Sequence, residues 1–342
     1  MRVMVFSPNW LGDAVMALPA VADIRRHPPV RRLTVAARPG VAGLWTMVAG
    51  VDEVVVIPGA RGMARWRTLG ENAAAIRRAE ADAAVLLPNS LQAALMARRA
   101  GIPERWGYRG NFRGWVLTRA VPRPRGQVHQ ADYYRRLAAA LGFANGERVP
   151  QLDVPPAIIE AARAMLTAAG WPPGTGLLGL APGAAYGGAK RWPPERFAAV
   201  AAELARSHGL VPVLLGADAD RHAACAIEAE LGRIGDGDVA ARVINLAGET
   251  DVPQLAGVLT LCAAFVSNDS GAMHLAAAIG APVVALFGPT DERVTAPVAH
   301  RARVLTADAW CRPCLLRECP LDHRCMDGID AGTVARAAGE CV

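Results

Sequence analysis

The chain has 342 residues, of which 52% are hydrophobic and 20% are charged. This length suggests two domains of about 150 residues each, and no apolar run reaches the roughly 20 residues that a membrane-spanning helix needs. The net charge of +6 favours an anionic partner, but the arginines are dispersed as on solvated helix faces, so we expect no nucleic-acid binding. The first residues lack the apolar stretch of a secretory signal and the cysteines number seven, which predicts a cytoplasmic protein with reduced thiols or a metal site.

Strand-like and helix-like stretches alternate in the first half of the chain. Short apolar runs predict strands, and amphipathic runs predict helices. Strands are expected at residues 3–7, 32–36, 54–57 and 83–87, and a helix is expected at residues 12–26. This alternation predicts a parallel, doubly wound sheet.

A polar, proline-rich segment at residues 149–156 predicts a linker, so we place the two domains at residues 1–153 and 154–342. After the linker the pattern restarts. Strands are expected at residues 177–181, 211–215, 243–245, 264–267 and 283–287, and helices at residues 157–169, 194–207, 219–231, 252–259 and 271–279. The predicted fold class is α/β, with two Rossmann-like doubly wound domains facing a cleft.

Four loops follow predicted strands, at residues 7–13, 182–190, 216–220 and 267–271. Ligands of doubly wound folds bind beyond the carboxyl ends of the strands, so these loops are expected to converge on one site.

The loop at residues 267–271 joins a strand to a helix through small polar residues. Backbone amides and the helix dipole at such a turn favour a phosphate, and Gly271 allows close approach to the backbone. The alternative is that Asp269 or Ser270 only caps the helix. His274, one turn further on, either faces the phosphate or packs in the core.

A glycine-rich loop follows the strand at residues 177–181 and contains Gly183 and Tyr186 before the adjacent cations Lys190 and Arg191. A compact ammonium beside flexible backbone could stabilise charge on a departing diphosphate, which needs no redox cofactor and no metal. The alternative is a surface loop with solvated charges.

The first strand-to-helix turn, residues 7–13, has one glycine and lacks the spaced glycines of a dinucleotide fingerprint, which argues against a nicotinamide cofactor. Asp13 at the helix start could take a proton from a substrate hydroxyl as a general base. It could equally be an ordinary carboxylate in the first turn of a helix.

Polar and arginine-rich segments of the first half are candidates for an anionic, sugar-rich acceptor, because arginine forks suit phosphate and carboxylate while aromatic rings suit sugars. Solvated loops remain the alternative. The predicted acceptor residues are Asn9, Trp10, Asn89, Ser90, Arg109, Arg113 and Gln130.

The C-terminal cysteines Cys311, Cys314, Cys319 and Cys325 lie within fifteen residues. Four thiolates could bind a structural zinc ion, although the spacing is not that of paired CxxC ribbons. The alternative is reduced cysteines without a metal. Cys225 and Cys262 lie on apolar patterns and are expected in the core.

Five segments taken together resemble the bacterial lipopolysaccharide heptosyltransferases of glycosyltransferase family 9, and most of all their heptosyltransferase II branch. These segments are Asn-Trp-Leu-Gly-Asp at residues 9–13, Leu-Pro-Asn-Ser at 87–90, the glycine-rich loop at 182–193, Asn-Leu-Ala-Gly-Glu-Thr at 245–250 and Asn-Asp-Ser-Gly-Ala-Met-His at 268–274. They cover nearly the whole chain in order.

The resemblance implies a GT-B fold and inverting transfer of heptose from ADP-L-glycero-D-manno-heptose to the inner core of lipid-anchored lipopolysaccharide. It implies a cytoplasmic monomer in peripheral contact with the inner face of the inner membrane and no required cofactor. Heptosyltransferases I and III, which belong to the same family, remain alternatives.

The resemblance also implies residue roles. Asp13 matches the family's proposed base and Lys190 its diphosphate-contacting lysine. The segment at residues 269–271 matches the donor phosphate and sugar loop, and Leu246, Ala247 and Gly248 match a segment beside the adenine. One departure is that Ala184 and Ala185 stand where relatives often carry hydroxyl residues.

Two other classes of protein fit parts of the pattern. A nicotinamide oxidoreductase would also have two α/β domains, but the glycine spacing argues against it, and an NADH absorbance assay distinguishes it. A non-catalytic nucleotide-binding protein would keep the phosphate loops, but it would not need both Asp13 and Lys190.

Overall fold

The computed structural model describes residues 1–59, 64–144, 146–234 and 237–342. The chain divides into two compact units, Met1–Asp153 and Val154–Val342, and the division falls within the predicted linker. Among the described residues, no helix is both long and apolar enough to cross a bilayer.

The N-terminal unit is built on a parallel sheet of six strands in the order β3-β2-β1-β4-β5-β6. Its strands are β1 (Arg2–Phe6), β2 (Arg32–Ala37), β3 (Glu53–Val56), β4 (Ala83–Leu86), β5 (Glu104–Tyr108) and β6 (Arg119–Val121). Its helices are α1 (Leu11–Met16), α2 (Leu18–Arg26), α3 (Pro39–Trp45), α4 (Ala64–Arg78), α5 (Leu91–Arg99) and α6 (Gln130–Ala140).

The C-terminal unit repeats this topology, with the strand order β9-β8-β7-β10-β11-β12 when read from the other edge. Its strands are β7 (Leu177–Ala181), β8 (Val211–Leu214), β9 (Ile244–Asn245), β10 (Cys262–Asn268), β11 (Val283–Phe287) and β12 (Ala302–Thr306). The β7 and β11 bounds equal the predicted ones.

The helices of this unit are α7 (Pro156–Ala168), α8 (Pro194–His208), α9 (Arg221–Arg233), α10 (Gly237–Ala240), α11 (Val252–Thr260), α12 (Gly271–Ala278), α13 (Glu292–Thr295), α14 (Arg324–Asp327) and α15 (Ala331–Gly339). Two single turns of 3-10 helix, Gly188–Lys190 and Asp218–Asp220, lie in the loops after β7 and β8.

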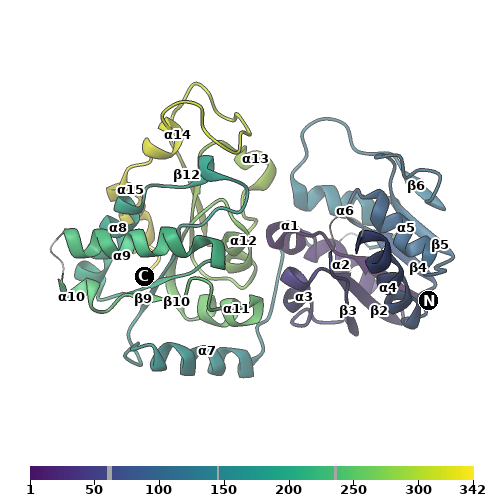
Figure 1. Ribbon diagram of the computed structural model, residues 1–342, viewed down its shortest axis with the longest axis horizontal. Coiled ribbons are helices and arrows are strands. Elements are labelled where there is room, and N and C mark those ends of the chain that lie inside the picture. Colours follow the sequence, from purple (N-terminus) through teal and green to yellow (C-terminus); the bar gives the residue numbers. More distant parts are fainter. Residues whose placement is uncertain (60–63, 145, 235–236) are drawn as a thin grey trace. The chain divides into compact units, whose positions relative to one another are not determined.

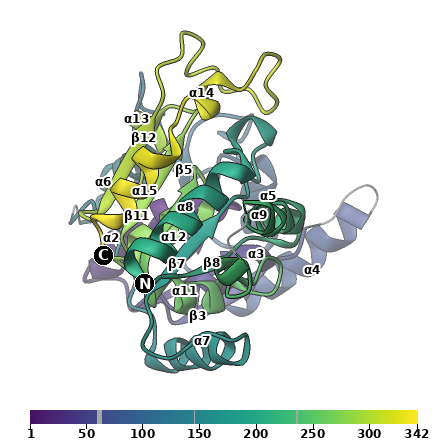
Figure 2. The same cartoon turned by 90° about the vertical axis from the view of Figure 1, so that its left-hand side faces the viewer.

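The side chains of each strand lie alternately on the two faces of its sheet, because successive side chains of a strand point to opposite sides. In the C-terminal sheet, Leu178, Leu180 and Val266 join one buried cluster with residues of α8, α9 and α15. In the N-terminal sheet, Met4 and Phe6 join a cluster with residues of α4 and α5. Figures 1 and 2 show the helices that cover these sheets.

The strand order locates a ligand site in each unit without reference to any motif. In a doubly wound sheet the crevice forms where successive connections leave in opposite directions. This switch point lies between β1 and β4 in the first unit and between β7 and β10 in the second. The loops that follow these four strands are therefore the candidate site.

Three sequence predictions need correction. The helix expected at residues 12–26 is two helices that meet at Ala17, because Pro19 in the first turn of α2 has no N–H to continue α1. The helix expected from residue 219 begins as a 3-10 turn and becomes α9 at Arg221. Cys225 on α9 is exposed, whereas Cys262 is buried as expected.

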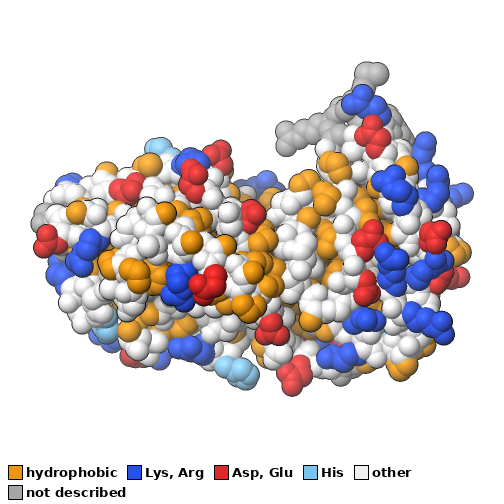
Figure 3. All heavy atoms as spheres, turned by 90° about the horizontal axis from the view of Figure 1, so that it is seen from below, with side chains coloured by type: hydrophobic (Ala, Val, Ile, Leu, Met, Phe, Trp, Pro, Cys, Tyr) orange, Lys and Arg blue, Asp and Glu red, His pale blue; other side chains and the backbone are white. Residues whose placement is uncertain are grey.

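Charged side chains of both signs are interspersed over the face shown in Figure 3. Several are paired in the N-terminal unit: Arg2 with Glu80 and Asp82, and Arg32 with Glu53. Solvent-exposed pairs of this kind contribute little to stability. On this face the charges therefore follow the predicted pattern of solvated surfaces.

Candidate functional site

The loops after β7 and β10 are joined by the side chain of Asn268, which is fully buried. Its amide nitrogen donates to the carbonyl oxygen of Pro182 at 2.7 Å, and its amide oxygen accepts from the backbone N–H of Trp192 at 3.2 Å. Both ends of the glycine-rich loop are thus fastened to the end of β10. The switch point of the C-terminal unit is one connected structure.

Lys190 lies inside this structure and is 9% exposed. Its Nζ donates to Oδ2 of Asp269 at 2.6 Å, and the same oxygen accepts from the Thr290 hydroxyl at 2.7 Å. The Lys190 Nζ also lies 4.8 Å from the centre of the Tyr186 ring. A buried ammonium is therefore held by a carboxylate and an aromatic face, so its position is fixed before any ligand arrives.

The C-terminal segment that follows β12, yellow in Figure 1, packs against the glycine-rich loop. Ala189 donates its N–H to the carbonyl oxygen of Arg317 at 2.9 Å, and the Tyr186 hydroxyl donates to that of Leu315 at 2.7 Å. Glu318 accepts from the N–H of Gly188 at 3.1 Å. The Cys-rich segment (residues 310–325) thus supports the loop that carries Lys190.

Two glycines of this loop are required by close contacts. A Cβ on Gly183 would lie 2.2 Å from the carboxyl carbon of Asp220, and a Cβ on Gly187 would lie 2.3 Å from the carbonyl oxygen of Arg317. The Gly183 contact brings the loop after β8 to the same place. Three of the four predicted loops, those of the C-terminal unit, therefore converge.

Gly187→Ala is expected to lower the free energy of unfolding by about 1–3 kcal/mol, because the new methyl group meets backbone that cannot turn away. The displaced loop should also lower the transfer rate. Gly232→Ala on α9 is the control, since a Cβ there meets no atom within 4 Å. Thermal denaturation and an activity assay check both variants, and equal behaviour would contradict the loop assignment.

Ser270 caps α12: its hydroxyl accepts from the N–H of Met273 at 3.4 Å and lies 3.0 Å from the Ser267 hydroxyl. Ser270 therefore caps the helix, and Gly271 occupies the first position of the helix. Phosphate binding by the backbone amides of this turn stays a prediction. His274 is 5% exposed and belongs to the buried face of α12. The role of His274 in donor binding stays a prediction.

The predicted adenine segment follows β9. The side chains of Leu246 and Ala247 are buried, so only their backbone can reach a ligand. Gly248 donates its N–H to the carbonyl oxygen of Gly216 at 2.9 Å, and Arg221 donates to the carbonyl oxygen of Gly248 at 3.1 Å. This segment therefore joins the loops after β8 and β9.

Arg191 is exposed at the end of the glycine-rich loop.

In the N-terminal unit, Asn9 and Ser90 line one small cavity between the ends of β1 and β4. Asp13 lies in the first turn of α1 and is partly buried. Burial raises the pKa of Tyr134 on α6 well above its usual range, and the nearby carboxylate of Asp13 raises it further. Asp13 thus lies at the switch point of its sheet, close to α6.

Arg113 is a correction to the predicted acceptor set. Arg113 is fully buried, and its guanidinium donates to the carbonyl oxygens of Tyr108 and Pro88 and to Oδ1 of Asn89. Asn89 in turn donates to the Tyr133 hydroxyl at 2.7 Å. Both side chains position the loop after β5. Arg113 is too deeply buried to contact an acceptor, whereas Asn89 is partly exposed and its contact with an acceptor stays a prediction.

The remaining predicted acceptor residues are at least partly exposed. Trp10 and Arg109 are exposed, and Gln130 at the start of α6 is partly exposed. Trp10 and Arg109 are therefore accessible to an acceptor, whereas the side chain of Gln130 is hydrogen-bonded to Tyr134.

The cysteine prediction has a mixed outcome. Burial raises the pKa of Cys325, and the neighbouring Cys311, Cys314 and Cys319 raise it further, so the four thiols are close in space. Within the described ranges, however, no three His, Cys, Asp or Glu side chains are arranged to hold a metal ion. A structural zinc site at these cysteines stays a prediction.

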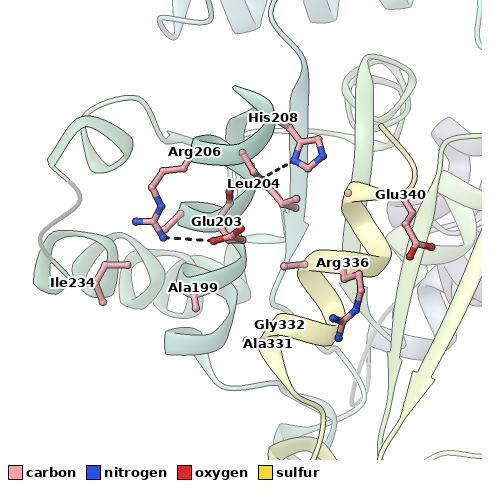
Figure 4. Close-up of a pocket in the computed structure, with 14 residues that line it drawn as sticks. Ala199, Glu203, Leu204, Arg206, His208, Ile234, Ala331, Gly332, Arg336 and Glu340 are labelled. Carbon is pink, nitrogen blue, oxygen red and sulfur yellow. Dashed lines mark hydrogen bonds and ion pairs between the residues drawn. The ribbon is translucent and has the colours of Figure 1, made fainter.

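A separate open hollow of about 860 Å³ lies between α8 and α15 (Figure 4). Its walls are formed by Glu203, Arg206 and His208 near the end of α8 and by small residues of α15. Because α8 runs back along the sheet from the carboxyl ends of the strands, this hollow lies away from Lys190. It is not the predicted site.

Sequence reasoning did not find Thr290 and Glu318, and it gave Asp220 only as the last residue of the expected loop at residues 216–220. Thr290 and Asp220 follow the ends of β11 and β8, a position that could have indicated them. Glu318 lies 128 residues after Lys190 in the sequence, and no local sequence pattern indicates that it contacts the glycine-rich loop.

Comparisons with known proteins agree with this geometry. Residues 70–324 match the family model described as glycosyltransferase family 9 (heptosyltransferase). The chain is 32% identical to lipopolysaccharide heptosyltransferase 2 of Salmonella typhimurium and to that of Escherichia coli, in each case over 89% of this chain and 88% of the relative.

The structure of E. coli ADP-heptose lipopolysaccharide heptosyltransferase II superposes with a TM-score of 0.84 at 29% identity, covering 100% of this chain and 98% of that one. E. coli heptosyltransferase in complex with ADP has the same fold, with a TM-score of 0.73 at 22% identity and full coverage of both chains. The predicted GT-B fold class is confirmed. The chain belongs to glycosyltransferase family 9, the heptosyltransferase family, and is a glycosyltransferase.

Proposed function

We propose that this protein transfers L-glycero-D-manno-heptose from ADP-heptose to the inner core of lipopolysaccharide, as a heptosyltransferase II. The observation that carries the proposal is the buried Lys190, held by Asp269 at the switch point of the C-terminal sheet. This is where a doubly wound domain binds a nucleotide diphosphate. The similarity to lipopolysaccharide heptosyltransferase 2 along 89% of the chain supports the choice of sugar and acceptor.

In the proposed reaction an acceptor hydroxyl attacks the anomeric carbon of the heptose from the face opposite ADP. The new bond joins the acceptor oxygen to this carbon, and the bond to the diphosphate oxygen breaks, so ADP leaves with the electron pair and the configuration inverts. The Asp13 carboxylate takes the hydroxyl proton. Lys190 and the backbone amides near Ser270 and Gly271 stabilise the charge on ADP.

The proposal includes no redox cofactor and no catalytic metal, because the transfer neither oxidises nor reduces either reactant and Lys190 can offset diphosphate charge. The protein would act as a cytoplasmic monomer in reversible contact with the inner face of the inner membrane, where its lipid-anchored acceptor lies. It would have no nucleic-acid partner.

The test incubates the purified protein with ADP-heptose and other sugar nucleotides, each with lipopolysaccharides truncated at different points of the inner core. Product mass is followed, with and without a chelator. We expect one heptose to be added, from ADP-heptose only, to an acceptor that already carries one heptose.

Other outcomes would redirect the proposal. Addition to a heptose-free acceptor would assign heptosyltransferase I, and addition only to an acceptor with two heptoses would assign heptosyltransferase III. Binding of ADP-heptose without any product would indicate a non-catalytic nucleotide-binding protein.

A further inference from the structure

The connection between β5 and β6 carries two exposed aromatic side chains. Residues 109–118 join these parallel strands without a helix. Phe112 is 91% exposed and Trp115 is 67% exposed, whereas the next two residues, Val116 and Leu117, are buried in the core. Two large apolar side chains pointing outward from one short segment mark a surface for a partner.

The segment is fastened on both sides of Phe112. Asn111 and Phe112 have φ angles of 49° and 55°, a left-handed conformation that a phenylalanine rarely adopts. Asn111 donates to the carbonyl oxygen of Asn89 at 2.5 Å, and the buried Arg113 donates to Asn89 and to the carbonyl oxygen of Tyr108 at 2.9 Å each. Phe112 is therefore held outward before binding, so little ordering remains to be done on contact.

Positive charge is concentrated around these aromatic residues. Residues 98–125 contain eight arginines and one glutamate, a net charge of +7, so the rest of the chain carries −1. The sequence interpretation of dispersed arginines thus misses a strongly basic stretch. The Arg98 guanidinium lies 5.4 Å from the centre of the Trp115 ring, which places one of these cations on the aromatic pair.

We propose that Phe112 and Trp115 insert into the surface layer of an anionic bilayer, with the exposed arginines of this stretch, such as Arg98 and Arg99, in contact with the lipid phosphates. A projecting phenylalanine without a polar group suits acyl chains, while arginine with tryptophan suits the headgroup layer. A sugar-binding site would instead surround its ligand with hydrogen-bonding groups. The inference rests on the proposed function, since a lipid-anchored acceptor requires work at a membrane.

Co-sedimentation with vesicles of phosphatidylglycerol and phosphatidylethanolamine tests the aromatic pair. Phe112→Ser with Trp115→Ser is expected to weaken binding about tenfold or more, because the inserted apolar area is lost. The matched control is Trp310→Ser, since Trp310 is 76% exposed and has the Arg324 guanidinium 5.3 Å from its ring. Equal loss in the control, or no wild-type binding, would overturn the assignment of this surface.

A second pair of variants tests the charge without touching the aromatic residues. Arg98→Gln should weaken binding to the anionic vesicles, and high salt should weaken wild-type binding. Arg78→Gln is its control, because both arginines lie in the last turn of a helix of the same unit. If Arg98→Gln binds like the wild type, the proposed contact with lipid phosphate is wrong.

Transfer assays separate this inference from the proposed function. With a water-soluble, deacylated acceptor, the Phe112 and Trp115 double variant should keep the wild-type kcat and KM. With the same acceptor in vesicles, its KM should rise. Equal loss on both acceptors would assign the aromatic pair to sugar binding instead. A wild-type protein that binds vesicles but transfers nothing would refute the proposed function alone.

Discussion

Lys190→Met is expected to reduce the rate of heptose transfer roughly 100- to 1,000-fold, because a preorganised cation no longer stabilises the departing diphosphate. Methionine retains most of the side-chain volume but removes the ammonium. The same change removes the partner of the buried Asp269 carboxylate, which should lower the free energy of unfolding by roughly 3–5 kcal/mol. Initial rates and denaturant unfolding measure the two effects.

The two effects can be separated by a second substitution. Lys190→Met combined with Asp269→Asn removes both charges, and the new amide oxygen at position 269 can still accept from the Thr290 hydroxyl, as the carboxylate does now. The double variant should regain most of the lost stability and none of the transfer rate. A double variant that recovers activity would show that the single variant fails through instability, and that Lys190 has no role in catalysis.

Lys190 is the single lysine among 37 lysines and arginines. All the other residues in this count are arginines. The lysine at position 190 therefore indicates that this site needs a compact ammonium group. Lys190→Arg should therefore also lose activity, since the larger guanidinium must fit between Asp269 and the Tyr186 ring. Reductive methylation offers a further test, because it can modify only Lys190 and the terminal amine, and bound ADP-heptose should slow the modification.

The fold was predictable because both sheets have strong local signals. Buried parallel strands are continuous apolar runs, and β7 and β11 match the expected bounds. The strands β6 and β12 were not predicted from the sequence, because neither forms an apolar run. β6 is three residues long with an exposed arginine, and β12 is only partly buried. The break between α1 and α2 was missed although Pro19, which has no N–H to continue α1, was a local signal for it.

The site was predictable where it follows the ends of strands. Asn9 and Ser90 line the same cavity, and Lys190 and Asp269 are paired, as expected for residues that follow strand ends at the switch points. Contacts over long sequence distances were not predictable, such as Glu318 on the N–H of Gly188. The burial of Arg113 was not predictable either, because it depends on tertiary packing. An arginine in a loop is usually solvated, whereas this one is buried under its own segment.

Asp13→Asn is expected to reduce heptose transfer roughly 100- to 10,000-fold while leaving ADP-heptose affinity unchanged. The amide keeps the size and the hydrogen-bonding reach of the side chain but cannot accept the hydroxyl proton. Asp13 lies in the N-terminal unit, whereas the predicted donor residues belong to the C-terminal unit, so loss of the carboxylate should not disturb donor binding. Product mass over time and calorimetric titration with ADP-heptose measure the two quantities.

The control must distinguish a base from an ordinary carboxylate in the first turn of a helix. Glu195→Gln removes such a carboxylate from α8, and it should leave transfer near the wild-type rate, since an exposed first-turn acid contributes only to the helix. If Asp13→Asn behaves like this control, the carboxylate serves α1 alone, and another group must take the acceptor proton. If it abolishes donor binding as well, Asp13 shapes the donor site and the two units cannot be assigned separate roles.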